Sequence, residues 1–358
     1  AGLALGSGQA ATSFCILNLC EAGDNIVSST DLYGGTWNLF ANTLKQMGVE
    51  VRFADPADPE AFARATDART RAYYAETLPN PKLRVFPIAE VAAIGRKLGV
   101  PLIMDNTAAP VLCKPLALGA AVVMHSTTKF IGGHGTSIGG VVVDGGNFDW
   151  EAPLGNGKGG ERFPTLNKPD NSYHGAVWTQ AVKPLGPIAY IIRMRVILLR
   201  DLGAPMAPMN AFLTLQGLET LPLRMERHCA NALQVARYLQ SHPAVAWVNY
   251  PGLPDHPQHA LLMRQMRGAS GLLAFGVKGG ADKGVAFIEA AQFMSHLVNI
   301  GDTRTLISHP ASTTHRQLSD EQQLAAGVKP DMVRISVGLE HIDDIPQDVD
   351  QALAVASA

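Results

Sequence analysis

The hexapeptide HSTTKF at residues 125–130, with the apolar run before it at residues 120–124, decides the fold of this chain. The run has the composition of a buried strand, and hydroxyl groups and one lysine follow it directly. In sheets built from alternating strands and helices, ligands bind beyond the carboxyl ends of the strands. Hydroxyl groups beside a cation suit a phosphate there, and a partly desolvated lysine can act as an amine nucleophile. The alternative is a polar strand exit with a solvated lysine.

Strand-like runs and helical patterns alternate around this stretch. Candidate strands lie at residues 25–28, 49–54, 71–75, 101–105, 120–125 and 139–144, and candidate helices at residues 9–20, 36–47, 59–66 and 88–98. Strands that alternate with helices predict a mostly parallel, doubly wound α/β sheet. The Gly/Pro/Asn-rich segment at residues 145–175 is typical of a long ordered surface loop.

The remainder of the chain predicts a smaller α+β domain. Helices are expected at residues 187–202, 210–241 and 283–293, and strands at residues 245–249, 271–277 and 332–337. Gly217 and Pro222 should bend or break the helix at residues 210–241. We therefore expect a large domain at residues 1–208 and a small C-terminal domain at residues 209–358.

Composition excludes several classes of protein. Of the 358 residues, 47% are hydrophobic and 17% charged, and the formal net charge is −2, which disfavours a disordered chain or a nucleic-acid binder. The apolar runs are far shorter than the roughly 20 residues that a membrane span needs. None of the four cysteines (Cys15, Cys20, Cys113 and Cys229) has metal-site spacing. We expect a cytoplasmic protein with free thiols, no metal site and no membrane or nucleic-acid partner.

Two more motifs put ligand groups at helix and strand ends. Ser7 can cap a helix whose first N–H groups, those of Gly8 and Gln9, would point at an anion, although many helices begin this way without a ligand. Asp105 ends an apolar strand and can hold a positively charged ring nitrogen. A turn cap is the common alternative for such an aspartate.

The motif DLYGGT at residues 31–36 and the strand around Arg334 complete the candidates. Paired glycines allow close approach of the backbone, and Tyr33 can lie flat on an aromatic ring. An arginine inside an apolar strand is costly unless it is paired, so Arg334 needs a carboxylate partner. That partner is either a protein Asp or Glu or the carboxylate of a substrate.

The order of these motifs resembles one known family. The run SGQAA (7–11), DLYGGT (31–36), ETLPNP (76–81), DNT (105–107), HSTTKFIGGHG (125–135), HPASTTH (309–315) and RISVGLE (334–340) resembles the Cys/Met-metabolism family of fold-type-I pyridoxal-phosphate enzymes over essentially the whole chain. Residues 15–19, 38–40, 139–146, 148–150, 172–175 and 210–228 most resemble its O-acetylhomoserine sulfhydrylase branch.

The resemblance implies a role for each matching residue. Lys129 would hold pyridoxal 5′-phosphate as a Schiff base, Asp105 would pair with the ring nitrogen, and Tyr33 would stack on the ring. The phosphate ligands would be Gly8, Gln9, Ser126 and Thr128. Asn80 and Thr107 would lie near the phenolic oxygen or the Schiff base. Arg334, with the Asn299 region beside it, would bind the α-carboxylate of the substrate.

The resemblance also implies a reaction, in which sulfide or a small thiol replaces the acetate of O-acetylhomoserine to give homocysteine in methionine biosynthesis. Lys129, Asp105 and Tyr33 would be the catalytic residues. The alternatives within the family are cystathionine γ-synthase, O-succinylhomoserine sulfhydrylase and a γ-lyase. Gly35 stands where the methionine γ-lyase branch has a cysteine, which disfavours that branch.

Two alternatives lie outside the family. A nicotinamide-binding module is disfavoured because the chain has no GxGxxG between a strand and a helix with an acidic residue about 20 positions later. A non-catalytic scaffold is disfavoured by the intact Lys129, Asp105, Tyr33 and Arg334.

The expected assembly also follows from the family. In the family, a tyrosine and an arginine from a segment upstream of SGxAA reach the phosphate of a neighbouring subunit, and we expect that such a segment is absent before Ala1. We expect a homotetramer, a dimer of dimers with active sites shared across the dimer interface. Its partners would be small-molecule substrates.

Overall fold

The larger of two sheets carries the strands around the HSTTKF motif. The computed structural model describes residues 1–154, 159–313, 316, 319, 321, 323 and 327–358. The seven strands of this sheet, in the order β1-β7-β6-β5-β4-β2-β3, are β1 (Gly2–Leu5), β2 (Asn25–Ser29), β3 (Glu50–Ala54), β4 (Thr70–Glu76), β5 (Leu102–Asp105), β6 (Val122–Ser126) and β7 (Gly140–Asp144). Strands β2 to β6 pair in parallel, whereas β7 and β1 are antiparallel. The predicted mostly parallel sheet is confirmed.

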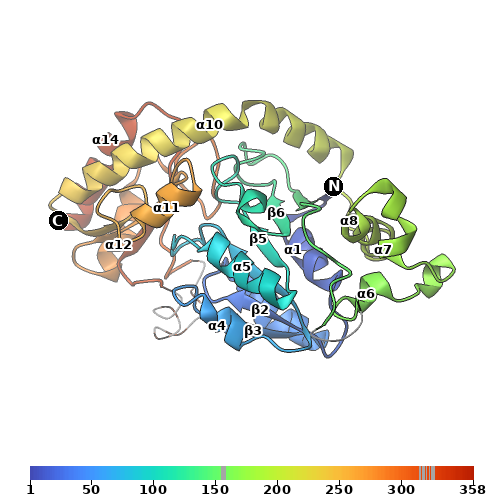
Figure 1. Cartoon of the computed structure of the whole chain (residues 1–358). Helices are drawn as coiled ribbons and strands as arrows, with labels where there is room; N and C mark the ends of the chain where they lie inside the picture. The colour runs from blue at the N-terminus through green and yellow to red at the C-terminus, as the bar shows by residue number, and fades with distance from the viewer. Residues whose placement is uncertain (155–158, 314–315, 317–318, 320, 322, 324–326) are drawn as a thin grey trace.

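Helices cover both faces of this sheet (Figure 1). They are α1 (Gly8–Leu17), α2 (Gly34–Asn38), the π-helical turn η1 (Leu39–Thr43), α3 (Leu44–Gln46), α4 (Glu60–Arg64), α5 (Ile88–Leu98) and the 3₁₀ turn η2 (Pro115–Leu118). Two neighbouring residues of β4 show the two faces, because side chains alternate along a strand. Tyr73 packs edge-on against Phe62 of α4 at 5.4 Å, and Tyr74 packs against Phe40 at 4.9 Å on the opposite face.

The edge strand β1 is not among the predicted strands. Its four residues alternate between exposed and buried, with Leu3 and Leu5 in the core, and they pair with β7. The pattern is too short to identify a strand without the neighbour that pairs with it.

The segment at residues 145–175 contains more regular secondary structure than the predicted ordered loop. It contains the short helix α6 (Pro164–Asn167) and the turn η3 (Asn171–Tyr173), while residues 155–158 lie outside the described part of the chain. Trp150 stacks on Tyr190 at 4.9 Å, so the segment is held by the core that it covers. After it come α7 (Trp178–Ala181), η4 (Lys183–Leu185), α8 (Ala189–Arg193), η5 (Met194–Leu199) and α9 (Arg200–Leu202).

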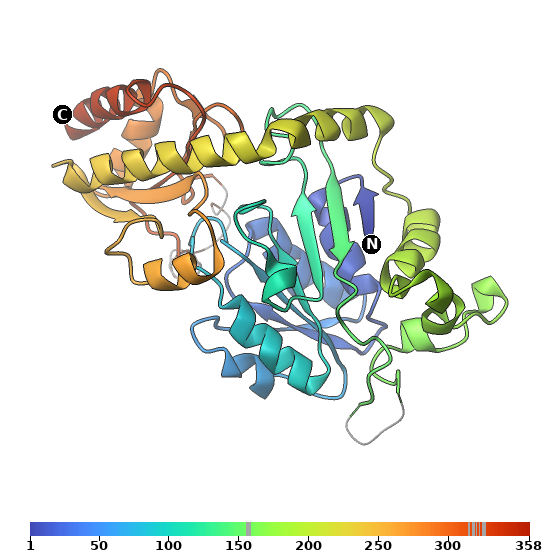
Figure 2. The same cartoon turned by 45° about the horizontal axis from the view of Figure 1, so that its top comes forward.

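Helix α10 (Pro208–Ser241) runs without interruption from the larger sheet to the smaller one (Figures 1 and 2). Of the predicted bend or break at Gly217 and Pro222, the break does not occur, and α10 follows an arched path as one continuous helix (Figure 1). A proline inside a helix costs about 3 kcal/mol, but tertiary contacts hold this turn. Arg224 donates to the carbonyl of Gly217 at 2.6 Å and to the carbonyls of Phe130 and Ile131 at 2.6 and 3.0 Å.

The smaller sheet has five strands in the order β10-β11-β12-β9-β8. They are β8 (Val245–Asn249), β9 (Leu272–Val277), β10 (Ser295–His296), β11 (Leu306–Ser308) and β12 (Met332–Ser336), with the helices α11 (His259–Gln265), α12 (Ala281–Ala290) and α14 (Asp344–Ser357). The α/β class with a smaller second sheet domain is as predicted. One apolar cluster includes Met104 of β5 and Ile335 of β12, so the two sheets share a core. The boundary between residues 208 and 209 stays a prediction.

Two properties of the described residues bear on the predicted class. None of their helices is long and apolar enough to cross a membrane. All four cysteines are free thiols, and Cys15, Cys20 and Cys113 are buried.

Candidate active site

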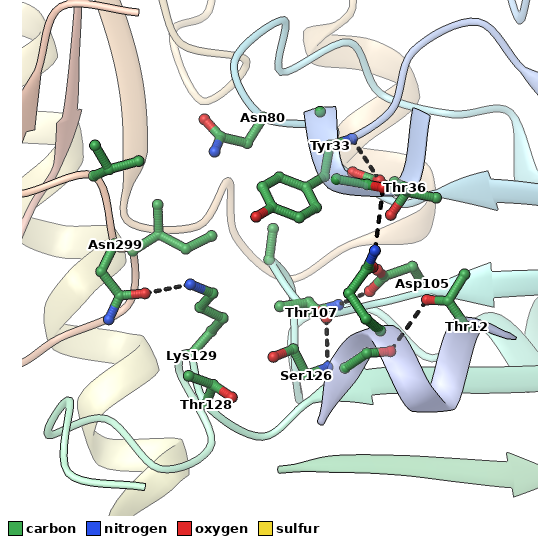
Figure 3. Close-up of a pocket in the computed structure, with 18 of the residues that line it drawn as sticks. Thr12, Tyr33, Thr36, Asn80, Asp105, Thr107, Ser126, Thr128, Lys129 and Asn299 are labelled. Atoms are coloured by element: carbon green, nitrogen blue, oxygen red, sulfur yellow. Dashed lines mark hydrogen bonds between the residues drawn. The ribbon is translucent and has the colours of Figure 1, made fainter. Parts of the chain in front are cut away.

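A cavity of about 650 Å³ lies where β4, β5 and β6 end, between the larger sheet and residues of the smaller one (Figure 3). Its lining includes every residue that the sequence predicts for the site: Gly8, Gln9, Tyr33, Asn80, Asp105, Thr107, Ser126, Thr128, Lys129, Asn299 and Arg334. Parallel strands end at one edge of their sheet, which explains how motifs distant in sequence meet here.

Lys129 follows β6 by three residues and extends into the cavity (Figure 3). Burial, and secondly the positive charge of Arg334, lower the pKa of Lys129 to about 8. Its Nζ donates a hydrogen bond to the side-chain oxygen of Asn299. A lysine with this pKa is partly neutral near pH 8 and can act as a nucleophile or a base.

Asp105, at the end of β5, both caps a turn and lines the cavity. Its Oδ1 accepts a hydrogen bond from the backbone N–H of Thr107 at 2.8 Å, and the hydroxyl oxygen of Thr107 accepts one from the N–H of Ser126 at 2.8 Å. Burial raises the pKa of Asp105, while the bonds from Thr107 oppose that rise. Asp105 therefore does cap a turn, as the alternative predicted, and it also lines the cavity.

The N-terminus of α1 offers hydrogen-bond donors to the cavity. Ser7 is the N-cap, as predicted, and its Oγ accepts from the N–H of Ala10 at 3.0 Å. The N–H groups of Gly8 and Gln9, which line the cavity, have no acceptor among the described residues. Such a helix end attracts anions. The hydroxyl of Thr128, in contrast, is engaged with the backbone of Gly139.

Tyr33 is held at the cavity by its main chain and is 47% exposed. Its N–H donates to Oε1 of Glu76 at 2.6 Å, and Gln9 donates to the carbonyl of Gly35 at 3.1 Å. A Cβ atom on Gly35 would come within 2.5 Å of Cε1 of Tyr33. Any side chain at position 35 would therefore displace the Tyr33 ring.

Arg334, on β12, is buried with an exposed fraction of 2%. It donates to the carbonyls of Val298 and Asn299, both at 3.0 Å, and more weakly to Leu297. Among the described residues no Asp or Glu forms an ion pair with it, so the predicted alternative of a protein carboxylate partner is not found. Burial lowers the pKa of Arg334 to about 10, which leaves it cationic at neutral pH. Its charge is available to an anion in the cavity.

Several lining residues are absent from the sequence prediction, among them Thr12, Asn38, Glu76 and Ser308. Thr12 lies one helical turn after Gly8 and donates to its carbonyl, so its position could have been inferred from the helix period. Glu76 belongs to the quoted motif ETLPNP but has no role assigned there. Residues 314–315 of the motif HPASTTH lie outside the described residues.

Comparisons with known proteins point to one family. The model of the Cys/Met metabolism PLP-dependent enzymes matches residues 1–354. The O-acetyl-L-homoserine sulfhydrylase of Leptospira meyeri is 50% identical, over 99% of this chain and 80% of its own length. The homocysteine synthase of Schizosaccharomyces pombe is 46% identical, over 99% of this chain and 82% of its own.

The likeness extends to a solved structure. A crystal structure of a Campylobacter jejuni protein, assigned as an O-acetylhomoserine (thiol)-lyase, contains N′-pyridoxyl-lysine-5′-monophosphate. It matches with a TM-score of 0.92 and 39% identity, over 99% of this chain and 82% of its own, and so confirms the expected fold. The chain thus belongs to the Cys/Met metabolism family of pyridoxal-phosphate-dependent enzymes.

Proposed function

We propose that the protein is an O-acetylhomoserine sulfhydrylase, which converts O-acetylhomoserine and hydrogen sulfide into homocysteine and acetate. One observation carries the proposal: a buried guanidinium with no carboxylate partner among the described residues and a lysine amine line the same cavity. Relatives that share about half of the sequence bear this name. The lysine and the guanidinium fit an amino-acid substrate whose α-carbon must lose a proton.

The cavity lining fits pyridoxal phosphate group by group. Lys129 offers a buried amine to the carbonyl carbon, and Asp105 offers a carboxyl to the ring nitrogen. The N–H groups of Gly8 and Gln9, with Ser126, suit the phosphate. The side-chain oxygen of Asn80 is buried without a partner among the described residues, which suits a polar group of the ring. When bound, the cofactor supplies an electron sink for the negative charge that develops at the substrate α-carbon.

The chain itself positions the substrate and moves protons. Arg334 binds the α-carboxylate, because a planar guanidinium can make two parallel hydrogen bonds to it. Lys129, with its lowered pKa, removes the α-proton and transfers protons at the β-carbon so that acetate can leave the γ-carbon. Tyr33, in the cavity lining, would lie against the cofactor ring and would be a second group for proton transfer. Sulfide then adds at the γ-carbon.

The charges of the lining favour an acetyl over a succinyl ester. The cationic side chains in the described lining are Lys129 and Arg334, and both have a task in this scheme. A succinyl group carries a further carboxylate that would compete for Arg334. Gly35 disfavours the γ-lyase alternative, because the methionine γ-lyase branch has a cysteine at this position.

We propose further that the chain forms a cytoplasmic homotetramer with active sites shared between subunits. Helix α10 exposes large apolar side chains, with exposed fractions of 66% for Met209, 54% for Phe212, 63% for Leu215 and 69% for Leu223. Exposed apolar surface of this extent is typical of protein interfaces. The predicted phosphate ligands Gly8, Gln9, Ser126 and Thr128 carry no positive charge, and a cation from a neighbouring subunit would supply it. Native mass spectrometry of the holoenzyme tests this, and a fully active monomer would contradict it.

A matched set of assays tests the reaction. O-Acetylhomoserine and O-succinylhomoserine are each supplied with sulfide, with cysteine, or with no thiol, and acetate or succinate, homocysteine, cystathionine and 2-oxobutyrate are measured. We expect homocysteine and acetate in equal amounts from the acetyl ester with sulfide. Faster turnover of the succinyl ester, cystathionine as the main product, or 2-oxobutyrate without thiol would each identify one of the alternative branches.

A further inference from the structure

Two acidic residues of the cavity lining stand opposite each other at the ends of neighbouring strands. Strands β4 and β5 pair in parallel, and their register sets Glu76 directly opposite Asp105. Both residues line the cavity, and Glu76 is 7% exposed. Like charges directly opposite each other in a sheet are destabilising, and burial adds to the cost of each charge. The two carboxyl groups should therefore not both be ionised.

The neighbours of the pair offer hydrogen bonds rather than cations. Glu76 accepts from the N–H of Tyr33 at 2.6 Å, and Asp105 accepts from the N–H of Thr107 at 2.8 Å. Among the described residues, neither carboxyl forms an ion pair.

The other charged and titratable groups near the pair are uncharged, neutralised by a partner or hydrogen-bonded elsewhere. Asp31 faces Glu76, but it is neutralised by Lys82 at 2.7 Å and Arg84 at 3.0 Å. Tyr74 and Cys15 lie near Asp105, and burial raises the pKa of both, so they are neutral. In the cavity, Lys129 donates a hydrogen bond to Asn299, and Arg334 donates hydrogen bonds to backbone carbonyls. One proton on the pair therefore resolves the repulsion.

We propose that Glu76 is a positioning residue that holds this proton at neutral pH, so that Asp105 stays anionic for the cofactor's ring nitrogen while Glu76 anchors the backbone of Tyr33. Burial, and secondly the charge of Asp105, raise the pKa of Glu76, whereas Asp105 has the two groups of Thr107 to stabilise its anion. The inference rests on cofactor binding, which the alternative reactions of the family share, and not on the choice of acyl group.

Two substitutions separate a protonated Glu76 from an ionised one. Glu76→Gln has the shape of the protonated acid, because its amide oxygen can accept from Tyr33 and its NH₂ group can donate to Asp105. Glu76→Leu has a similar size but neither hydrogen-bonding group. Circular dichroism and thermal melting check that each variant folds. The readouts are the affinity of the apoprotein for pyridoxal phosphate between pH 5 and 9, and the infrared band of a protonated carboxyl group.

The expected results are specific. The affinity of Glu76→Gln for the cofactor should lie within about threefold of that of wild type, and it should fall at the same acidic pH. The affinity of Glu76→Leu should be about tenfold lower or more, because this variant loses a buried hydrogen bond. The wild-type infrared band at neutral pH should be absent in Glu76→Gln. The proposal would be overturned if the acidic midpoint of the affinity profile lay about one pH unit lower in Glu76→Gln than in wild type. It would also be overturned if Glu76→Leu bound the cofactor with wild-type affinity. A wild-type protein that binds the cofactor but does not transfer sulfide would contradict the proposed reaction alone.

Discussion

The two walls of the cavity are built differently. On the larger sheet, polar groups are joined to one another, as in the chain from Asp105 through Thr107 to Ser126 and in the bond between Glu76 and Tyr33. On the smaller sheet, Arg334 is held by backbone carbonyls that cannot neutralise its charge. The first wall is pre-organised for a ligand that stays bound, and the second has a charge that a transient substrate can satisfy.

Lys129 connects the two walls. It extends from the strand-end loop of the larger sheet and donates to Asn299, whose own carbonyl accepts from Arg334. We therefore expect substitution of Lys129 to reduce activity most. Substitutions in the wall of the larger sheet (the cofactor wall) should reduce it less, and substitutions in the wall of the smaller sheet (the substrate wall) least.

Lys129→Ala should have the largest effect. Loss of the amine removes both the attachment point of the cofactor and the base, so homocysteine formation should fall by a factor of about a thousand or more. Activity and the visible absorbance of the bound cofactor are the measurements, with the exposed Lys97→Ala as control. Substantial activity in Lys129→Ala would show that another residue carries the chemistry.

Asp105→Asn tests the cofactor wall. An asparagine oxygen can still accept from the N–H of Thr107, so the thermal midpoint should change little. Its neutral amide cannot stabilise a protonated ring nitrogen, and the rate should fall by a factor of about a hundred or more, as expected when an electrostatic partner is lost. A rate close to wild type would reduce Asp105 to a turn cap.

Arg334→Lys tests the substrate wall. The ammonium group keeps the charge but cannot form the planar pair of bonds to a carboxylate. We expect KM for O-acetylhomoserine to rise by about ten- to a hundredfold, the effect of about 1.4–2.8 kcal/mol of lost binding, with cofactor affinity unchanged. Loss of cofactor with normal KM would give Arg334 a structural role instead.

A smaller effect concerns the pKa of Lys129, which Arg334 helps to lower. A neighbouring positive charge disfavours the protonated amine, so removing it in Arg334→Met should raise the pKa of Lys129 from about 8 toward that of an ordinary lysine. In the apoprotein, the pH at which Lys129 becomes half-reactive toward an acylating reagent should move upward. An unchanged midpoint would mean that burial alone sets the lysine pKa.

Much of the site could be read from the sequence because its residues follow directly after strands. Asp105 is the last residue of β5 and Lys129 lies three residues after β6, and the fold brings these strand ends together. The sequence assigns no role to Glu76, because the importance of this residue depends on its register with Asp105, which no local pattern reveals. The carbonyls around Arg334 are 35 or more positions away in the sequence, so its need for a partner was predictable but the identity of the partner was not.

Helix α10 also limits how this protein can be engineered. A Cβ atom on Gly217 would lie 2.3 Å from the carbonyl oxygen of Ile131, two residues after Lys129, and Arg224 bonds to the same stretch. Backbone meets backbone there, so no side chain can rearrange to absorb an added methyl group. A library that seeks new acyl donors or thiols should vary Leu78, Val298 or Ile300, which line the cavity. Position 217 should stay glycine, because a side chain there would push against the backbone at Ile131 and displace Lys129, although position 217 itself lies outside the cavity lining.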